Sequence, residues 1–158
     1  MREILFRGKQ LDNGEWVYGE VISCYSGKSY IFPHGSWGGE SDRISEEGWL
    51  RLFAFEVDPE TIGQYTGLKD KNGVKIFEGD VVQRRTPIYK LGEKAPIGEY
   101  LARGKVVWDE SSFTEVGYYT VSTYDHLGNT TKTILFNGIN GWYVIGNIHD
   151  NPELSGGI

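Results

Sequence analysis

Cysteine, methionine and histidine are scarce in this chain. Its 158 residues include one cysteine, one methionine and three histidines. The single cysteine, Cys24, excludes an intramolecular disulfide. A metal site needs several histidine, cysteine or carboxylate ligands at suitable spacing, and His34, His126 and His149 lie far apart in the sequence. We therefore expect no bound metal or other cofactor.

Long apolar runs are missing as well. No stretch approaches the roughly 20 apolar residues of a membrane-spanning helix, and residues 1–11 lack the apolar region and cleavage site of a signal peptide. The chain also lacks the glycine-rich phosphate loops and the serine nucleophile elbow. These absences predict a cytoplasmic protein with no membrane contact, and they argue against an enzyme.

Glycine and aromatic residues are, by contrast, abundant. The chain has 22 glycines, and its 5 Trp, 10 Tyr and 7 Phe make up 14% of the residues. Glycine weakens helices, whereas aromatic side chains fit the half-buried surface of a pleated sheet. With 39% hydrophobic and 24% charged residues, the composition is that of a globular protein. We therefore predict a mainly β protein with many tight turns and little helix.

Turn-forming residues divide the chain into short strands. In the stretch 62–82, the residues Asp70 to Gly73 predict a hairpin turn, and the Gly79-Asp80 pair predicts a second bend. Asp58, which is followed by proline, predicts either a single helical turn with the aspartate as its N-cap or a plain β-turn.

Two long connections and a domain boundary are predicted from the same signals. Residues 33–47 and 83–103 hold scattered proline and glycine and lack regular apolar spacing. Residues 49–57 fit a buried strand or one face of a short helix, and their aromatic content favours the strand. We place the boundary between an N-terminal β-rich subdomain, residues 1–57, and a C-terminal domain, residues 58–158. The other predicted strands are 4–11, 15–23, 29–32, 104–108, 116–124, 132–137 and 142–148.

The formal net charge of −6 is unevenly distributed. Residues 11–68 carry three bases and ten acids, whereas residues 69–105 carry nine bases and five acids. An acidic protein repels phosphate backbones at long range, but a basic segment attracts them at short range. A solvated loop of mixed charge is the simpler interpretation of this segment. Nucleic acid therefore stays an alternative partner that the net charge disfavours.

Three blocks of sequence carry a resemblance to a known family. They are REILFRG near the start, VDPETIGQYTGLKDKNGVKIFEGDVV in the middle and VIGNIHDNPEL near the end. Together they resemble the YopX protein family of bacteriophages and prophages. The resemblance implies a C-terminal SH3-like small barrel, preceded by a β-rich N-terminal subdomain, in a protein of a bacterial host cytoplasm. It implies no activity and no catalytic residue, because the function of the family is uncharacterised.

The candidate interaction surface combines aromatic and basic residues near irregular segments. Small barrels bind peptides or single-stranded nucleic acid through exposed aromatic side chains beside basic or polar grooves. The loops 33–48 and 84–103 are the segments whose residues turn chemistry leaves unexplained. The candidate residues are Trp37, Arg84, Arg85, Tyr89, Lys90, Lys94, Arg103 and Trp142.

These features favour a non-catalytic protein-interaction module, a phage or prophage accessory protein that binds an unidentified protein of host or phage. A homo-oligomer is one form of this hypothesis. The alternative is a nucleic-acid-binding small-barrel protein that uses the basic segment 69–105. An enzyme is the least favoured hypothesis. Cys24 could act as a nucleophile, but a small, half-buried side chain in a strand is the simpler interpretation. Glu78 and Asp80 likewise fit a turn better than a cation site.

Overall fold

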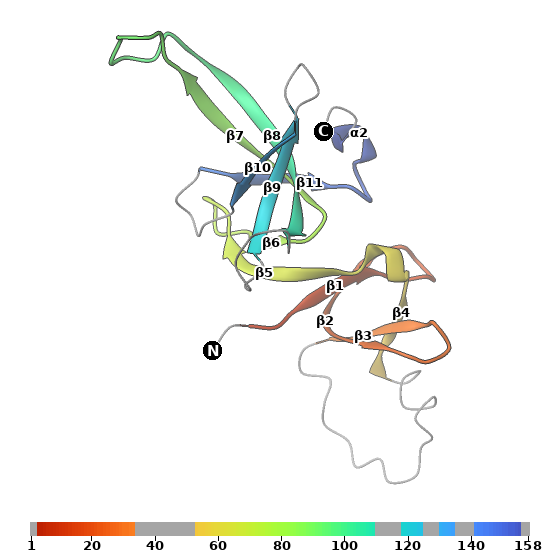
Figure 1. Cartoon of the computed structure of the whole chain (residues 1–158). Helices are drawn as coiled ribbons and strands as arrows, with labels where there is room; N and C mark the ends of the chain where they lie inside the picture. The colour runs from red at the N-terminus through yellow and green to blue at the C-terminus, as the bar shows by residue number, and fades with distance from the viewer. Residues whose placement is uncertain (1–2, 34–52, 110–117, 125–129, 135–140, 156–158) are drawn as a thin grey trace, which may run out of the picture. The chain divides into compact units, whose positions relative to one another are not determined.

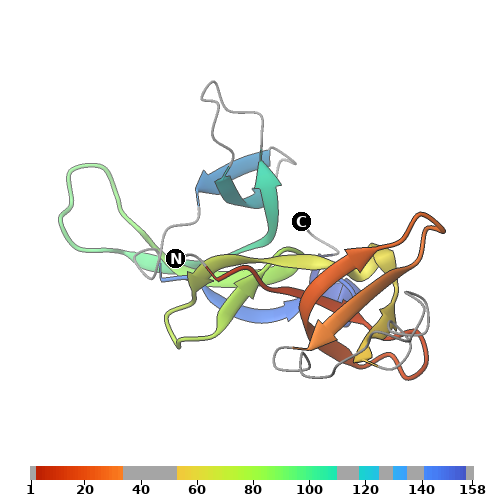
Figure 2. The ribbon, with the colours of Figure 1, turned by 90° about the horizontal axis from the view of Figure 1, so that it is seen from below.

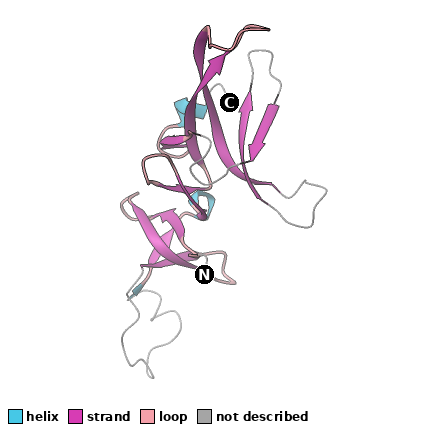
Figure 3. Cartoon of the chain, turned by 90° about the vertical axis from the view of Figure 1, so that its left-hand side faces the viewer, coloured by secondary structure: helices cyan, strands magenta, loops and turns pink. Residues whose placement is uncertain are grey.

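The computed structural model describes residues 3–33, 53–109, 118–124, 130–134 and 141–155. The chain divides into two compact units, Met1–Tyr65 and Thr66–Ile158. In the described residues it is mainly β, with two antiparallel sheets and almost no helix, which confirms the predicted class (Figures 1 and 3). No closed barrel is detected in this part of the chain. The predicted boundary between the N-terminal subdomain, residues 1–57, and the C-terminal domain, residues 58–158, stays a prediction.

The first unit is built on an antiparallel meander, in which the predicted strands 4–11, 15–23 and 29–32 are present with slightly different bounds. Its elements are β1 (Phe6–Lys9), β2 (Trp16–Ser23), β3 (Ser29–Pro33), β4 (Phe55–Val57), the 3₁₀ turn η1 (Pro59–Thr61) and the start of β5 (Gly63–Lys69). β1 pairs with β2, β2 with β3 and β3 with β4, and Figure 2 shows β2 and β3, in orange, side by side. The side chains of Val17, Ile31 and Val57 form a buried core cluster. β4 confirms a strand at the end of the stretch 49–57, whose first four residues lie outside the described part.

The second unit contains a five-stranded antiparallel sheet. Its elements are the end of β5, β6 (Lys75–Phe77), β7 (Asp80–Ile88), β8 (Gly98–Asp109), β9 (Tyr118–Tyr124), β10 (Thr130–Ile134), β11 (Tyr143–Asn147) and the short helix α2 (Pro152–Ser155). The order in this sheet is β10-β9-β8-β7-β11, while β5 joins β1 to β6 in the other sheet. Four buried side chains form the core of the unit: Ile76, Val82, Val106 and Trp142.

The prediction that residues 83–103 form an irregular connection is wrong. β7 and β8 pair continuously from Val81↔Lys105 to Ile88↔Gly98, which leaves only the tip outside the strands. Figure 1 shows this green hairpin extending beyond the other strands of its unit. Pro87 misled the prediction. Beyond Gln83, β7 has only β8 as a paired neighbour in the described part, and a strand with one open side tolerates a residue that lacks an N–H donor.

The first predicted turn of the stretch 62–82 is held by the carboxylate of Asp70. Oδ1 accepts hydrogen bonds from the backbone N–H groups of Asn72 at 2.7 Å and Val74 at 2.9 Å. Oδ2 accepts one from the N–H of Val144, in β11, at 3.1 Å. Gly73 has φ +84°, which glycine adopts without strain. The predicted turn is therefore confirmed, and the same side chain also ties it to β11.

The other two aspartate turns are also confirmed. Asp58 caps η1, because its Oδ1 accepts a hydrogen bond from the N–H of Glu60 at 3.0 Å. Asp80 follows Gly79, which has φ +79°, and its Oδ2 accepts a hydrogen bond from the N–H of Phe77 at 2.8 Å. The carboxylate of Asp80 thus serves the bend between β6 and β7, as turn chemistry predicts.

Replacing Asp70 tests how much the second unit depends on this carboxylate. Asp70→Ala removes the acceptor for three backbone N–H groups at a site that is only 6% exposed. We expect the free energy of unfolding to fall by about 2 kcal/mol, since hydrogen bonds to a charged group contribute roughly 1.5–3 kcal/mol and these three are only partly buried. The measurement is urea-induced unfolding followed by tryptophan fluorescence. The control is Asn72→Ala in the same turn, which we expect to change stability by less than about 0.5 kcal/mol. Equal stability of the two variants would contradict the assignment.

Candidate functional site

The distal part of the β7–β8 hairpin carries a concentration of exposed apolar side chains. We define residues 84–103 as the arm. Six of its large apolar residues have exposed fractions from 42% to 102%. Such a group on one projecting element is typical of an interaction surface, because isolated exposed apolar side chains are common but clustered ones are not. These residues are Ile88, Tyr89, Leu91, Ile97, Tyr100 and Leu101.

The arm is also basic, in contrast to the rest of the chain. Its five bases and two acids give a net charge of +3, which leaves −9 for the remaining residues. Both acids lie beside bases of the arm. Arg85 contacts Glu99 with 2.6 Å between Nη1 and Oε1, and Lys90 contacts Glu93 with 4.0 Å between Nζ and Oε1. Two of the five candidate bases are therefore already engaged within the arm.

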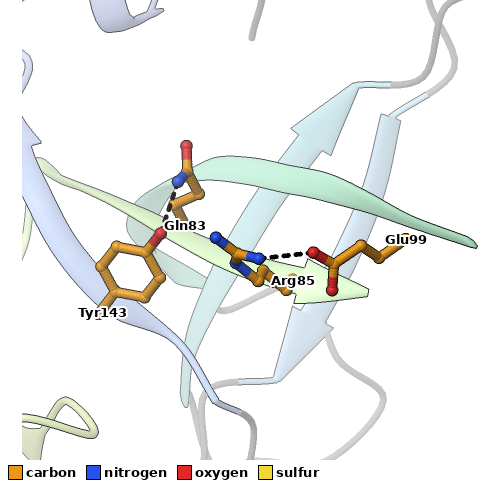
Figure 4. Close-up of polar contacts among 4 residues, drawn as sticks. All are labelled: Gln83, Arg85, Glu99 and Tyr143. Atoms are coloured by element: carbon orange, nitrogen blue, oxygen red, sulfur yellow. Dashed lines mark hydrogen bonds and ion pairs between the residues drawn. The ribbon is translucent and has the colours of Figure 1, made fainter. Parts of the chain in front are cut away.

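A hydrogen-bonded chain fixes the base of the arm. Gln83 donates from Nε2 to the hydroxyl of Tyr143, in β11, at 2.7 Å (Figure 4). Arg103 donates from Nη2 to Oε1 of Gln83 at 3.2 Å. The ammonium of Lys71 lies 4.1 Å from the centroid of the Tyr143 ring, which is within cation–π range. Arg103 is thus connected through Gln83 to β11.

Trp142 was expected as an exposed aromatic platform, and the structure corrects this. Its side chain is only 3% exposed and packs in the core of the second unit with Val82 and Val106. The guanidinium carbon of Arg84 lies 4.7 Å from the centroid of its ring. Within the described residues, Nε of Arg84 and Nε1 of Trp142 are buried without hydrogen-bond partners. Trp142 therefore anchors the base of the arm.

The remaining predicted candidates divide between the arm and the part of the chain outside the described residues. Tyr89, Lys90 and Lys94 are exposed at or near the tip of the arm. Trp37 lies outside the described residues, as does nearly all of the loop 33–48. The exposed aliphatic residues of the arm were not included in the predicted interaction surface, because residues 84–103 were expected to form a loop and not a pair of strands.

Cys24, which the sequence offers as a nucleophile, lies in the first unit. Cys24 is half-buried and packs against the cluster of Tyr30 and Phe32. An open hollow of about 540 Å³ is lined by residues 10–12 and 53–56. In the described part of both units, no group of three His, Cys, Asp or Glu side chains is placed to hold a metal ion. None of the helices in that part is long and apolar enough to cross a membrane.

The described fold and surface define a mainly β protein with a projecting, apolar and basic hairpin. The sequence matches the family model described as YopX protein over residues 5–155, so the chain belongs to the YopX family. Among solved structures it is similar to the crystal structure of protein EF1440 from Enterococcus faecalis. That match has 22% sequence identity, a TM-score of 0.47, and covers 98% of this chain and 99% of the other. No curated protein matches the chain.

Proposed function

We propose that this YopX family protein is a non-catalytic protein-interaction module of a phage or prophage, acting in the cytoplasm of the bacterial host. The arm is its binding element. The observation that carries the proposal is the group of six exposed apolar side chains on the arm. Clustered apolar surface of this kind is stabilised when a partner covers it, because burial removes it from water.

The composition of the arm favours a protein partner over nucleic acid. Four of its six exposed apolar residues are aliphatic, and aliphatic side chains pack against proteins but do not stack on bases. The ion pairs of Arg85 with Glu99 and of Lys90 with Glu93 also reduce the cationic surface that phosphates would meet.

We interpret the second unit as a variant of the SH3-like small barrel. The five antiparallel strands β7 to β11 and the turns between β5, β6 and β7 support this interpretation. In such a barrel, the arm would be a greatly extended hairpin between two neighbouring strands.

A capture experiment with two matched triple variants tests the proposal. The arm variant is Ile88→Ser, Leu91→Ser and Ile97→Ser. The control variant is Ile4→Ser, Leu11→Ser and Val74→Ser, which changes three exposed apolar residues outside the arm. Each protein is immobilised and exposed to lysate of a host with and without phage induction, and the retained proteins are identified by mass spectrometry.

We expect the wild-type protein and the control variant to retain the same specific partners and the arm variant to lose them. All three proteins should keep the same melting temperature, because the replaced side chains lie on the surface. If the arm variant retained the same partners as the wild-type protein, the arm would not be the binding element.

Nucleic-acid binding is the second candidate, and its support is the net charge of +3 on the arm beside Tyr89 and Tyr100. We expect the wild-type protein to shift neither single- nor double-stranded oligonucleotides at low salt, because the whole chain is acidic. The measurement is fluorescence anisotropy across a salt series, with Lys94→Gln as a comparison. Binding that weakens steeply with salt and is reduced in this variant would replace the protein-interaction proposal.

A further inference from the structure

One edge of β8 is without a strand neighbour in the described part of the chain. On one side, β8 pairs with β7 over Gly98–Lys105. On the other side, it pairs with β9 only over Lys105–Asp109. The stretch from Gly98 to Gly104 therefore has, among the described strands, no partner on its β9 side. The backbone N–H and C=O groups along such an edge are a template for pairing with another chain.

The sequence of this edge is complementary to itself when it runs antiparallel. It reads Gly98-Glu99-Tyr100-Leu101-Ala102-Arg103-Gly104. A two-fold axis at Leu101 places Glu99 of one copy opposite Arg103 of the other, and this ion pair occurs twice. The same axis places Tyr100 opposite Ala102, so that a large side chain meets a small one. The two terminal glycines meet each other, and Leu101 meets its own copy.

The side chains of this edge are directed so that these pairs would form. Alternate residues of a strand share a face, so Glu99, Leu101 and Arg103 lie on one face of β8 and Tyr100 and Ala102 on the other. Directly opposite residues of two antiparallel strands also share a face. Tyr100 and Leu101 are 52% and 56% exposed, so the pairing would cover apolar surface that now faces solvent.

We propose that this edge of β8, which has no strand neighbour among the described residues, pairs with the same edge of a second copy of this chain, with the two-fold axis at Leu101. The inference rests on the proposed interaction function and names a second copy as one partner of the arm. Two projecting two-stranded ribbons would then form one four-stranded antiparallel sheet. An isolated two-stranded ribbon is only marginally stable in water. A sheet of three or more strands with an apolar face is stable on its own.

The available length fits this pairing. β8 begins at Gly98, and the first pair with β9 is at Lys105. A seven-residue partner strand would therefore end beside Gly104, next to the last residues of β9, which continues to Tyr124. A two-fold contact of this kind uses the same patch on both copies and closes at two subunits.

The opposite edge of the arm, on β7, is less suited to self-association. Pro87 lies in that strand and has no N–H to donate to a neighbour. The adjacent bases Arg84 and Arg85 would also come close to the same bases of a second copy. These features protect the β7 edge, and they leave the β8 edge as the pairing side.

A charge-swap series in the full chain tests the proposal. Arg103→Glu would place Glu99 opposite a glutamate at both ends of the paired edge, and Glu99→Arg would place two bases opposite each other. We expect each single change to weaken dimerisation by about tenfold, since cross-strand charge pairs contribute up to roughly 1 kcal/mol each. The double change restores opposite charges and should restore the dimer. The measurement is analytical ultracentrifugation over a wide range of protein concentration.

Lys94→Glu is the matched control, because it makes the same charge change as Arg103→Glu at the tip of the arm and outside the paired edge. We expect it to dimerise like the wild-type protein. A wild-type protein that stays monomeric at every concentration, or a double variant that dimerises no better than the single ones, would overturn the proposal.

A cysteine at the axis tests the register directly. In a Cys24→Ser background, Leu101→Cys would bring two thiols together across strands whose Cα atoms are roughly 4.5–5.5 Å apart, which a disulfide spans. Mild oxidation should then give a covalent dimer, whereas Leu91→Cys at the tip should not. Equal cross-linking of the two variants would contradict the register.

The two proposals fail separately. A monomeric wild-type protein that still captures other proteins through Ile88, Leu91 and Ile97 would overturn the self-pairing and leave the interaction function standing. A dimer that captures no other protein would support the self-pairing and limit the function to homo-oligomerisation.

Discussion

The buried carboxylate of Asp70 is the interaction on which the second unit depends. It accepts hydrogen bonds from two N–H groups of its own turn and from the N–H of Val144, and it is shielded from water. The N–H of the next residue, Lys71, donates to the carbonyl of Trp142 at 3.1 Å. These bonds hold the β5–β6 turn against the start of β11. Without them, several partly buried N–H groups would lose their acceptors, which costs more than losing a fully exposed hydrogen bond.

The position of β11 determines how the arm is supported. Trp142 enters the core beside Val82 and lies against the guanidinium of Arg84. Tyr143 accepts the hydrogen bond from Gln83, and Gln83 in turn accepts one from Arg103. The base of the arm is therefore fixed by packing and polar contacts, whereas its distal half has no further strand beside it in the described part. A rigid base with an exposed end presents a partner with a preformed surface, which lowers the entropic cost of binding.

Local chemistry made the turns predictable, and non-local pairing made the arm unpredictable. The turns at Asp58, Asp70 and Gly79 follow from residues within four positions of one another. Predicting the β7–β8 hairpin requires knowing that one side of β7 is unpaired around Pro87. A single sequence does not show which side of a strand is unpaired. Trp142 lies just before β11, and its burial depends on packing with Ile76, Val82 and Val106, which are distant from it in the sequence. A shift of one residue exchanges the two faces of a strand, so an aromatic residue next to a strand has no predictable side.

The charges on the β8 edge explain how an exposed strand would avoid indiscriminate pairing. Native sheets protect their edges with charged residues, because most incoming strands leave these charges without partners. Within one copy, Glu99 contacts Arg85 and Arg103 donates to Gln83, and one register of self-pairing also brings Glu99 opposite Arg103 of the second copy. In the two neighbouring registers, Glu99 would face Ala102 or Gly104, and the attraction would be lost. The same two residues therefore oppose foreign strands and select one arrangement of a second copy, which is specificity obtained from charge position and not from total charge.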